Sequence, residues 1–306
     1  MKKLFALLLA LALVLSCAAL AENAKVYLIT MDLFDAHWVA VDQGCKDAAE
    51  ELGGIDYVWT GPTQGKDDAA QIECINNAYA DGADVILLAS NGPDTQVATL
   101  EEIYNEGVKI IYVDSPANFD GALATLATDN KQGGFIAGQQ FLAEAEARGV
   151  TEGKVGVINC NPATVSTVLR EEGFREALEG SNFEFLETQY SEGQAAKSQE
   201  IANNFIAEGV VGIFGANEGC AVGLGNANAE NDNAVIAVGF DKTEALYDLV
   251  RQGSLLCTCA QNPYVMGYEG MKMAKAALDG QTEFEDVDTG VYVIDAAYIA
   301  ENIDNQ

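Results

Sequence analysis

Short apolar runs alternate with helical segments along almost the whole chain. Each apolar run has the length of one strand, and the segment after it has the apolar spacing of an amphipathic helix. Parallel strands need such a crossover between them. The alternation therefore predicts an α/β fold with parallel strands and helices on both faces. In the first half the expected strands are residues 25–30, 57–59, 85–89 and 110–113, and the expected helices are residues 39–52, 69–80 and 100–105.

The same alternation begins again near residue 123. A chain of 306 residues has the length of about two domains. We therefore expect two doubly wound lobes. Because no Pro- or Ser-rich linker separates them, we expect the lobes to be joined by strand crossings rather than by a flexible tether. The expected strands of the second half are residues 123–128, 155–159, 183–188, 211–214, 235–238 and 255–259, and residues 135–147 are an expected helix.

The charge composition excludes several classes of function. The chain has 16 basic and 47 acidic residues, hence a net charge of −31. Such a chain repels nucleic acids and anionic lipid surfaces. His37 is the only histidine, which removes most metal sites and most Ser-His or Cys-His catalysis. Because the sequence also has no phosphate-binding glycine loop and no EF-hand loop, we expect no metal and no cofactor.

Residues 1–21 have the pattern of an export signal. Two lysines, Lys2 and Lys3, precede an apolar run over residues 4–15, which is shorter than the ~20 residues needed to span a bilayer. Cleavage after residue 21 would release a soluble protein. Residues 14–17 instead resemble a lipoprotein processing site, which would leave a lipid anchor on Cys17. The short spacer after Cys17 favours the soluble form, and both forms place the protein outside the cytoplasm.

The remaining cysteines stand singly inside apolar segments. In an exported chain their number would also fit a disulfide framework. Because no C-x-x-C pair occurs, we interpret them as small core residues. One disulfide and a metal site are the alternatives. The residues are Cys45, Cys74, Cys160, Cys220, Cys257 and Cys259.

Polar residues follow the expected strands at their carboxyl ends, where ligands bind in open α/β sheets. They comprise carboxylates, amides, one arginine and one tryptophan, without a nucleophile beside a base. Carboxylates accept strong hydrogen bonds from hydroxyl groups, amides and arginine donate them, and an aromatic face packs against C–H groups. This set is therefore suited to a sugar. In chain order it contains Asp32, Asp35, His37, Trp38, Ser90, Asn91, Asp114, Ser115, Arg170, Asn217, Asp241 and Gln261.

Eight short motifs, in the same order, make the chain resemble the type I periplasmic substrate-binding proteins of ABC transporters, in particular the ribose- and galactose-binding group. None of the motifs is specific alone, but together they cover nearly the whole mature chain. They are Trp38 six residues before Gly44, ILLASN at 86–91, IIYVDSPA at 110–117, TDN at 128–130, REEGF at 170–174, IFGANE at 213–218, AVGFDKT at 237–243 and AQNP at 260–263.

The resemblance implies the type I fold of that family, with two doubly wound lobes joined by several hinge crossings. It implies an N-terminal lobe of residues 25–129 plus 262–288 and a C-terminal lobe of residues 130–261 plus 289–306. Asp129 and Asn130 are assigned to a crossing rather than to the ligand. With Ser90 and Asn91 from the strand ends, the expected ligand-binding residues are Asp35, His37, Trp38, Ser90, Asn91, Asp114, Arg170, Asn217, Asp241 and Gln261.

By the same resemblance, the function is capture of a monosaccharide or similar polyhydroxylated molecule in the inter-lobe cleft and its delivery to an ABC permease. A sensory protein for a chemoreceptor, or for an autoinducer-2-like signal, is the alternative. The resemblance does not select one sugar, because Ser115 stands where pentose-binding members often have arginine and His37 replaces a second aromatic. Residues 60–68 are more similar to the rhamnose- or autoinducer-2-binding branch. A hydrolase using the aspartates as acid and base, and a transcription regulator, which would need a basic DNA-binding segment, are disfavoured.

Overall fold

The computed structural model describes residues 23–63 and 67–305. It divides into two compact units. Unit 1 comprises Met1–Leu126 and Pro263–Val287, and unit 2 comprises Ala127–Asn262 and Asp288–Gln306. The chain thus passes from one unit to the other at three places. The expected export signal and the expected anchor at Cys17 lie outside the described residues.

Unit 1 is built on a sheet with the strand order β12-β5-β4-β3-β1-β2. Neighbouring strands from β5 to β2 pair in parallel. Helices connect β1, β2, β3 and β4 in the chain, whereas β4 is followed by β5 without a helix between them. β3 is buried along its whole length, which is typical of a parallel strand covered on both faces. The strands are β1 (Ala24–Ile29), β2 (Ile55–Thr60), β3 (Val85–Leu88), β4 (Lys109–Val113), β5 (Thr125–Ala127) and β12 (Val287–Asp288).

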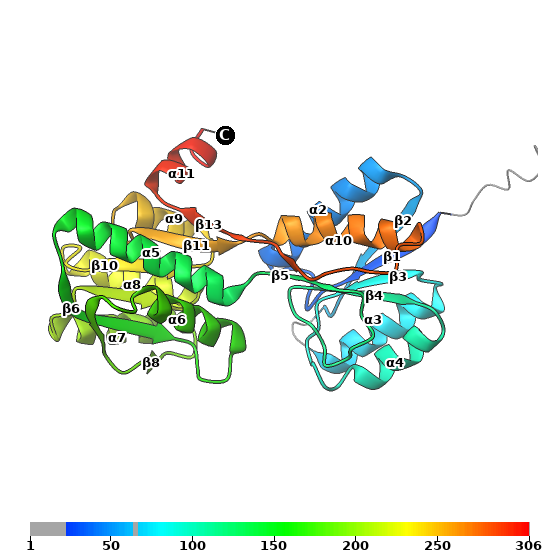
Figure 1. The fold of residues 1–306 in the computed structure, drawn as a ribbon, viewed down its shortest axis with the longest axis horizontal. Helices are drawn as coiled ribbons and strands as arrows, with labels where there is room; N and C mark the ends of the chain where they lie inside the picture. Colours follow the sequence, from blue (N-terminus) through cyan, green and yellow to red (C-terminus); the bar gives the residue numbers. More distant parts are fainter. Residues whose placement is uncertain (1–22, 64–66, 306) are drawn as a thin grey trace, which may run out of the picture. The chain divides into compact units, whose positions relative to one another are not determined.

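Helices cover both faces of the unit 1 sheet (Figure 1). Alternate strand residues explain this arrangement, because successive side chains point to opposite faces. Val26, Leu28 and Leu87 pack with α2 (Ala36–Leu52) and α10 (Pro263–Leu278). On the other face, strand residues such as Ile86 and Leu88 pack with α3 (Asp68–Ala80) and α4 (Val97–Asn105).

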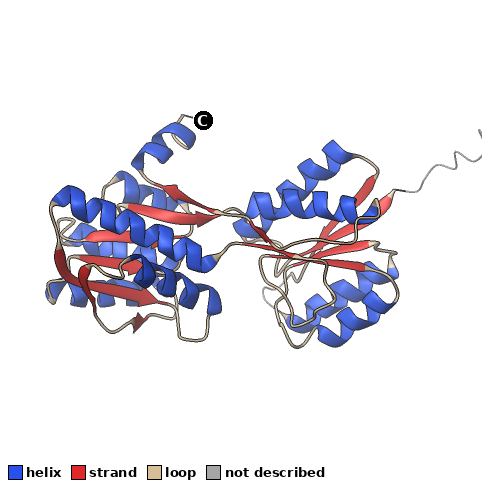
Figure 2. Cartoon of the chain, viewed as in Figure 1, coloured by secondary structure: helices blue, strands red, loops and turns tan. Residues whose placement is uncertain are grey.

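Unit 2 repeats this plan with the order β13-β11-β10-β9-β6-β7, and β8 also pairs with β6 (Figure 2). The pairs among β6, β7, β8, β9, β10 and β11 are parallel, whereas β13 is antiparallel to β11. The strands are β6 (Glu152–Asn159), β7 (Asn182–Phe185), β8 (Gln189–Tyr190), β9 (Gly212–Gly215), β10 (Ile236–Phe240), β11 (Cys257–Gln261) and β13 (Val291–Ile294).

The unit 2 sheet also separates two apolar clusters. One face packs against α5 (Asn130–Arg148) and α6 (Val165–Ala177). The other face packs against α7 (Ala195–Ala207), α8 (Glu218–Glu230), α9 (Glu244–Arg251) and α11 (Ala296–Asn302). Every strand that the sequence predicts is therefore present, and the predicted fold class is confirmed. The short strands β8, β12 and β13 and the helix α11 were not predicted.

Glycines allow α5 and α6 to approach until their backbones touch. A Cβ atom on Gly134 of α5 would lie 1.8 Å from the carbonyl oxygen of Arg170. A Cβ atom on Gly173 of α6 would lie 1.8 Å from the carbonyl oxygen of Lys131. No side chain larger than hydrogen fits at such distances. The contact fixes the part of α6 that carries Arg170, one of the expected ligand-binding residues.

All six cysteines of the described residues are free thiols. Cys45, Cys160, Cys220, Cys257 and Cys259 belong to the buried apolar set, and Cys74 is partly exposed. Their positions agree with the interpretation of these residues as small core side chains.

Candidate functional site

In unit 1 the segment between β1 and α2 is folded by two aspartates. Asp32 Oδ1 accepts hydrogen bonds from the N–H groups of Phe34 and Asp35, at 3.0 and 2.8 Å. Asp35 Oδ1 then caps α2 by accepting from the N–H of His37 at 2.9 Å. A side-chain oxygen at this position satisfies an amide that the helix leaves unpaired. These bonds fix the first turn of α2, which carries His37 and Trp38.

His37 lies between Trp38 and Asp114, at the end of β4. Its Nε2 is 3.5 Å from Asp114 Oδ1. Its ring meets the Trp38 ring edge to face, with 4.6 Å between the ring centroids. Trp38 itself is only 4 % exposed and belongs to the apolar core of unit 1. The structure therefore places Trp38 as the support of His37, and His37 as the side chain next to the carboxylate.

Asp114 has an unusual backbone conformation for a residue with a side chain. Its φ is 65°, in the left-handed region, which aspartate tolerates better than most residues. Its N–H donates to the carbonyl of Leu126 on β5 at 2.8 Å. Its Oδ2 accepts from the hydroxyl of Ser115 at 2.6 Å. These bonds hold the carboxylate at the carboxyl end of the sheet.

Ser90 and Asn91 lie at the same edge, directly after β3. The N–H of Ser90 donates to the carbonyl of Ser115 at 2.8 Å, which brings this segment beside Asp114. Asn91 is fixed by its N–H, which donates to Gln71 Oε1 at 2.8 Å. The Ser90 hydroxyl and Asn91 Oδ1 are buried without a hydrogen-bond partner. Such groups are rare in native proteins, because a buried polar atom without a partner costs free energy.

Arg170 is the centre of the corresponding group in unit 2. It extends from α6 and is only 3 % exposed. Its Nε donates to Asn130 Oδ1 at 2.9 Å, and its Nη1 donates to the carbonyl of Ala216 at 3.1 Å. The guanidinium carbon lies 3.8 Å from the centre of the Phe240 ring. With the helix contact at Gly134, these interactions leave the arginine little conformational freedom.

Asp241 stands next to Arg170, at the end of β10. Its Oδ1 is 3.7 Å from Arg170 Nη1 and accepts from Gln261 Nε2 at 3.4 Å. Its Oδ2 accepts from the N–H of Glu218 at 3.0 Å. Asp241 also has a left-handed backbone, with a φ of 75°. The carboxyl ends of β10 and β11 therefore bring Arg170, Asp241 and Gln261 together.

Asn217 completes this group at the start of α8. Its Oδ1 caps the helix by accepting from the N–H of Cys220 at 3.0 Å. Because the cap uses the oxygen, the amide nitrogen of Asn217 is the atom that can donate to a ligand. Asn217 precedes Glu218, whose N–H binds Asp241, so the cap also positions the carboxylate.

The structure thus forms two groups from the expected residues, one in each unit. Unit 1 brings together Asp35, His37, Trp38, Ser90, Asn91 and Asp114, and unit 2 brings together Arg170, Asn217, Asp241 and Gln261.

Two residues that were not among the expected ligand-binding residues are associated with these groups. Asn130, assigned to a crossing from the sequence, orients Arg170, and the TDN motif at 128–130 contained the signal. Phe34 is 66 % exposed in the segment before α2. An exposed aromatic residue in this segment is the kind of side chain that packs against an apolar ligand face. The signal that could have identified it is a large apolar residue in a polar loop.

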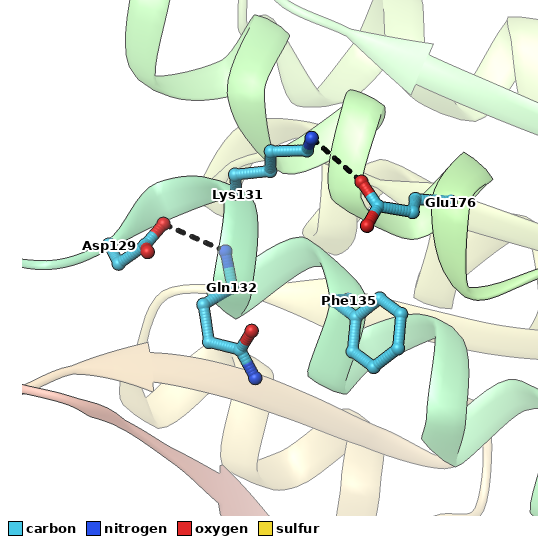
Figure 3. Close-up of a pocket in the computed structure, with 5 residues that line it drawn as sticks. All are labelled: Asp129, Lys131, Gln132, Phe135 and Glu176. Carbon is cyan, nitrogen blue, oxygen red and sulfur yellow. Dashed lines mark hydrogen bonds and ion pairs between the residues drawn. The ribbon is translucent and has the colours of Figure 1, made fainter.

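A separate pocket of about 200 Å³ lies in unit 2 at the beginning of α5 (Figure 3). Asp129, Lys131, Gln132, Phe135 and Glu176 line it. Lys131 Nζ binds Glu176 at 2.7 Å, an interaction that raises the pKa of Lys131. Asp129 Oδ1 accepts from the N–H of Gln132 at 2.9 Å. None of the expected ligand-binding residues lines this pocket, and its charged groups already have protein partners.

Within residues 23–63 and 67–305, no cluster of three or more histidine, cysteine, aspartate or glutamate side chains could hold a metal ion. In the same part of the chain, no helix has the length and apolar character required to cross a bilayer.

Comparison with curated proteins finds relatives of nearly the same length. The chain is 27 % identical over 285 residues to the ribose import binding protein RbsB of Haemophilus influenzae, covering 92 % of this chain and 95 % of the relative. It is 25 % identical over 297 residues to the D-allose-binding periplasmic protein of Escherichia coli, covering 90 % and 94 %.

Solved structures give the same result. A carbohydrate transporter solute-binding protein from Agrobacterium radiobacter, in complex with D-arabinose, has a TM-score of 0.75 and 28 % identity, covering 91 % of this chain and 96 % of that chain. An ABC transporter solute-binding protein from Agrobacterium vitis with bound D-fucose has a TM-score of 0.73 and 28 % identity, covering 91 % and 98 %. The family model described as periplasmic binding protein domain matches residues 26–282. The chain therefore belongs to the periplasmic binding protein family, whose members are exported binding proteins and not enzymes.

Proposed function

We propose that this protein binds a monosaccharide, or a similar small polyhydroxylated molecule, and delivers it to the permease of an ABC importer. The observation that carries the proposal is the set of buried polar groups at the carboxyl ends of β3 and β4 in unit 1, together with Arg170 and Asp241 in unit 2. Import is favoured over sensing because relatives of matching length are named import binding proteins.

The chemistry of the two groups fits hydroxyl recognition. Asp114 supplies a carboxylate acceptor at the same sheet edge as the Ser90 hydroxyl and the Asn91 side-chain oxygen, and the backbone bond from Ser90 to Ser115 joins the two segments. Each sugar hydroxyl is both a donor and an acceptor, and a hydrogen bond to a charged partner contributes about 1.5–3 kcal/mol. The missing partners of Ser90 and Asn91 would be supplied by ligand hydroxyls. An analogue without those hydroxyls would leave buried groups unpaired and bind more weakly.

The group in unit 2 adds a preorganised cation. Arg170 is already oriented by Asn130, the carbonyl of Ala216 and the Phe240 ring. A side chain held before binding loses little further entropy when the ligand arrives. Its positive charge is balanced by Asp241, so the group suits an uncharged polar ligand better than a sugar phosphate or a sugar acid.

Thermal melts against a panel of compounds test the proposal. The mature protein would be unfolded, freed of any copurified molecule, refolded, and mixed with pentoses, hexoses, deoxyhexoses, polyols, nucleosides and autoinducer-2. A ligand at 100 times its Kd adds about 2.7 kcal/mol of stability. We expect a clear rise in Tm with one compound or with a few stereochemically related sugars. A refolded protein that responds to none of them, with no small molecule in the extract, would contradict the proposal.

The anchoring of the exported protein is a separate proposal. The resemblance of residues 14–17 to a lipoprotein site and the cleavage pattern at residues 19–21 predict different mature chains. We propose the soluble form, which starts at Glu22. The intact mass of the protein isolated from its native membrane and soluble fractions distinguishes the two, because lipidation adds acyl chains to Cys17.

A further inference from the structure

The buried face of α3 carries a polar side chain where an apolar one is expected. Its buried residues are Gln71, Ile75 and Ala78, which have the i, i+4, i+7 spacing of a helix stripe that faces a core. Ile75 and Ala78 pack in the apolar cluster on that face of the unit 1 sheet. Gln71 is 0 % exposed. A buried amide without partners costs free energy, so the partners of Gln71 decide why the helix tolerates it.

The Gln71 amide makes every hydrogen bond of which it is capable. Nε2 donates to the carbonyl of Thr30, directly after β1, and to the carbonyl of Ala89, directly after β3, both at 2.8 Å. Oε1 accepts from the N–H of Asn91 at 2.8 Å and from Gln96 Nε2. An amide has two donor hydrogens and an oxygen with two lone pairs. Exchanging the nitrogen and the oxygen would lose all four bonds, so the orientation of the amide is fixed.

These bonds join the two chain segments that carry the unit 1 group. β1 and β3 are neighbouring parallel strands. Asp35, His37 and Trp38 lie in the segment that follows β1, whereas Asn91 lies in the segment that follows β3. With its four bonds made and no exposed surface, Gln71 has no polar atom left with which to bind a ligand itself. Its contribution to the site is therefore indirect.

We propose that Gln71 is a positioning residue, which holds Asn91 in the orientation required for hydroxyl recognition before the ligand arrives. The inference rests on the proposed sugar binding. Asn91 Oδ1 is buried without a hydrogen-bond partner, and a sugar hydroxyl can supply one. The direction of this oxygen depends on the backbone of Asn91, which Gln71 holds through the N–H. Because hydrogen bonds weaken steeply with misalignment, Gln71 contributes to the choice between sugars that differ in the direction of one hydroxyl.

A second buried amide provides a matched control. Asn228 of α8 is 2 % exposed. Its Nδ2 donates to the carbonyls of Val235 and Ser254 at 3.1 and 2.9 Å, and its Oδ1 accepts from the N–H of Val235 at 3.1 Å. Val235 precedes β10 and Ser254 precedes β11. This amide therefore joins the amino ends of two strands, whereas the expected ligand-binding residues of unit 2 include Asp241 and Gln261 from their carboxyl ends.

Hydrogen exchange of the sugar-free protein tests the positioning itself. In the wild type the N–H of Asn91 should be protected before any sugar is added. In Gln71→Met, which has a similar length but no hydrogen-bonding group, residues 89–91 should exchange at least about tenfold faster. In Asn228→Leu their exchange should not change. An unprotected Asn91 in the sugar-free wild type would overturn the proposal, and this measurement stands even if Gln71→Met fails to fold.

Calorimetric titration with the sugar found by the thermal panel tests the consequence for recognition. Both variants should melt several degrees lower than the wild type, since each loses a buried amide. Only Gln71→Met should bind the sugar more weakly, at least about tenfold, and discriminate less between the sugar and its epimers. Asn228→Leu should keep the affinity and the discrimination of the wild type. An equal loss of affinity in the two variants would overturn the proposal.

A double variant separates positioning from general weakening of unit 1. Gln71→Met combined with Asn91→Ala should bind no more weakly than Asn91→Ala alone, because both changes act through the same side chain. Additive losses would overturn the proposal. A wild type that protects Asn91 but binds no compound of the panel would support the fixed orientation and contradict the proposed sugar binding. The two failures are therefore distinguishable.

Discussion

Asp114 in unit 1 and Asp241 in unit 2 occupy equivalent places with different partners. Each follows an interior strand of its sheet, has a left-handed backbone and donates its N–H at 2.8 Å to a carbonyl of the next parallel strand, Leu126 or Cys259. Asp114, however, has His37 at 3.5 Å, whereas Asp241 has Arg170 at 3.7 Å. The same backbone conformation thus holds two carboxylates in different electrostatic surroundings.

Because their basic partners differ, we expect Asp241 to contribute to stability as well as to recognition, and Asp114 to contribute mainly to recognition. Arg170 is buried and permanently charged, so Asp241 is needed to balance it even without a ligand. The His37 side chain, in contrast, is 22 % exposed, against 4 % for Arg170, so solvent screens its contact with Asp114 more strongly. We therefore expect changes in unit 2 to affect folding and binding together, and changes at Asp114 to affect mainly binding.

Arg170→Ala is expected to have the largest effect. It removes the cation that stands beside Asp241, so we expect sugar affinity to fall at least about 100-fold, as loss of charged hydrogen bonds implies. Calorimetric titration with the sugar found by the thermal panel measures this. Arg175→Ala is the matched control on the same helix, since Arg175 is 34 % exposed and binds Glu171 rather than Asp241. Unchanged affinity in Arg170→Ala would contradict the proposal that the group in unit 2 contacts the ligand.

Asp114→Asn and Asp241→Asn compare the two carboxylates directly, and asparagine tolerates the left-handed backbone. We expect each to lower affinity by about 10- to 50-fold, since a charged acceptor becomes neutral. Only Asp241→Asn should also lower the free energy of unfolding, by about 2 kcal/mol, because it leaves Arg170 unbalanced. Denaturant unfolding of both variants without sugar reads this difference. Equal losses of stability in the two variants would mean that His37 and Arg170 do not give the two aspartates different roles in folding.

Gly134→Ala and Gly44→Ala test the helix contacts beneath the two groups. A Cβ atom on Gly44 would lie 2.1 Å from the carbonyl oxygen of Tyr264 on α10, as one on Gly134 would meet Arg170 on α6. We expect each variant to lose about 1–3 kcal/mol of unfolding free energy. Gly134→Ala should in addition lower sugar affinity about tenfold, because it displaces α6 at Arg170. If Gly134→Ala is less stable but keeps its sugar affinity, the contact between α5 and α6 does not determine the position of Arg170.

The smallest expected effect concerns His37. His37→Gln removes the ring whose Nε2 lies 3.5 Å from Asp114 Oδ1 but keeps a polar side chain, so we expect sugar affinity to fall only about threefold. Calorimetric titration with the same sugar measures the change. A loss as large as that of Asp114→Asn would mean that His37 itself is a main contact of the sugar.

Much of the fold follows from the sequence because helix and strand periods alternate so regularly. Val85, Ile86, Leu87 and Leu88 predict a strand covered on both faces, and β3 is buried throughout. The unpredicted β13 is an edge strand that runs antiparallel to β11. It therefore lacks the alternation of strand and helix from which the other strands were predicted. Strand β8 has two residues, too few for any periodicity.

The candidate site could be predicted only in part. Strand ends and motif order select Asp114, Arg170 and Asp241, because parallel strands bring their carboxyl ends to one edge. They do not reveal that Trp38 lies 96 % buried beneath His37, nor that Asn130 binds Arg170. Those facts depend on side-chain packing between segments distant in the sequence.

The left-handed backbones of Asp114 and Asp241 bear on how this protein can change by mutation. Glycine suits that conformation better than any residue with a side chain, so the backbone alone would favour glycine at both positions. Glycine would also remove both carboxylates. Selection for a higher melting temperature alone would therefore favour Asp114→Gly, a more stable protein that binds its ligand more weakly. This is the trade-off between stability and activity expected where a strained residue has a function.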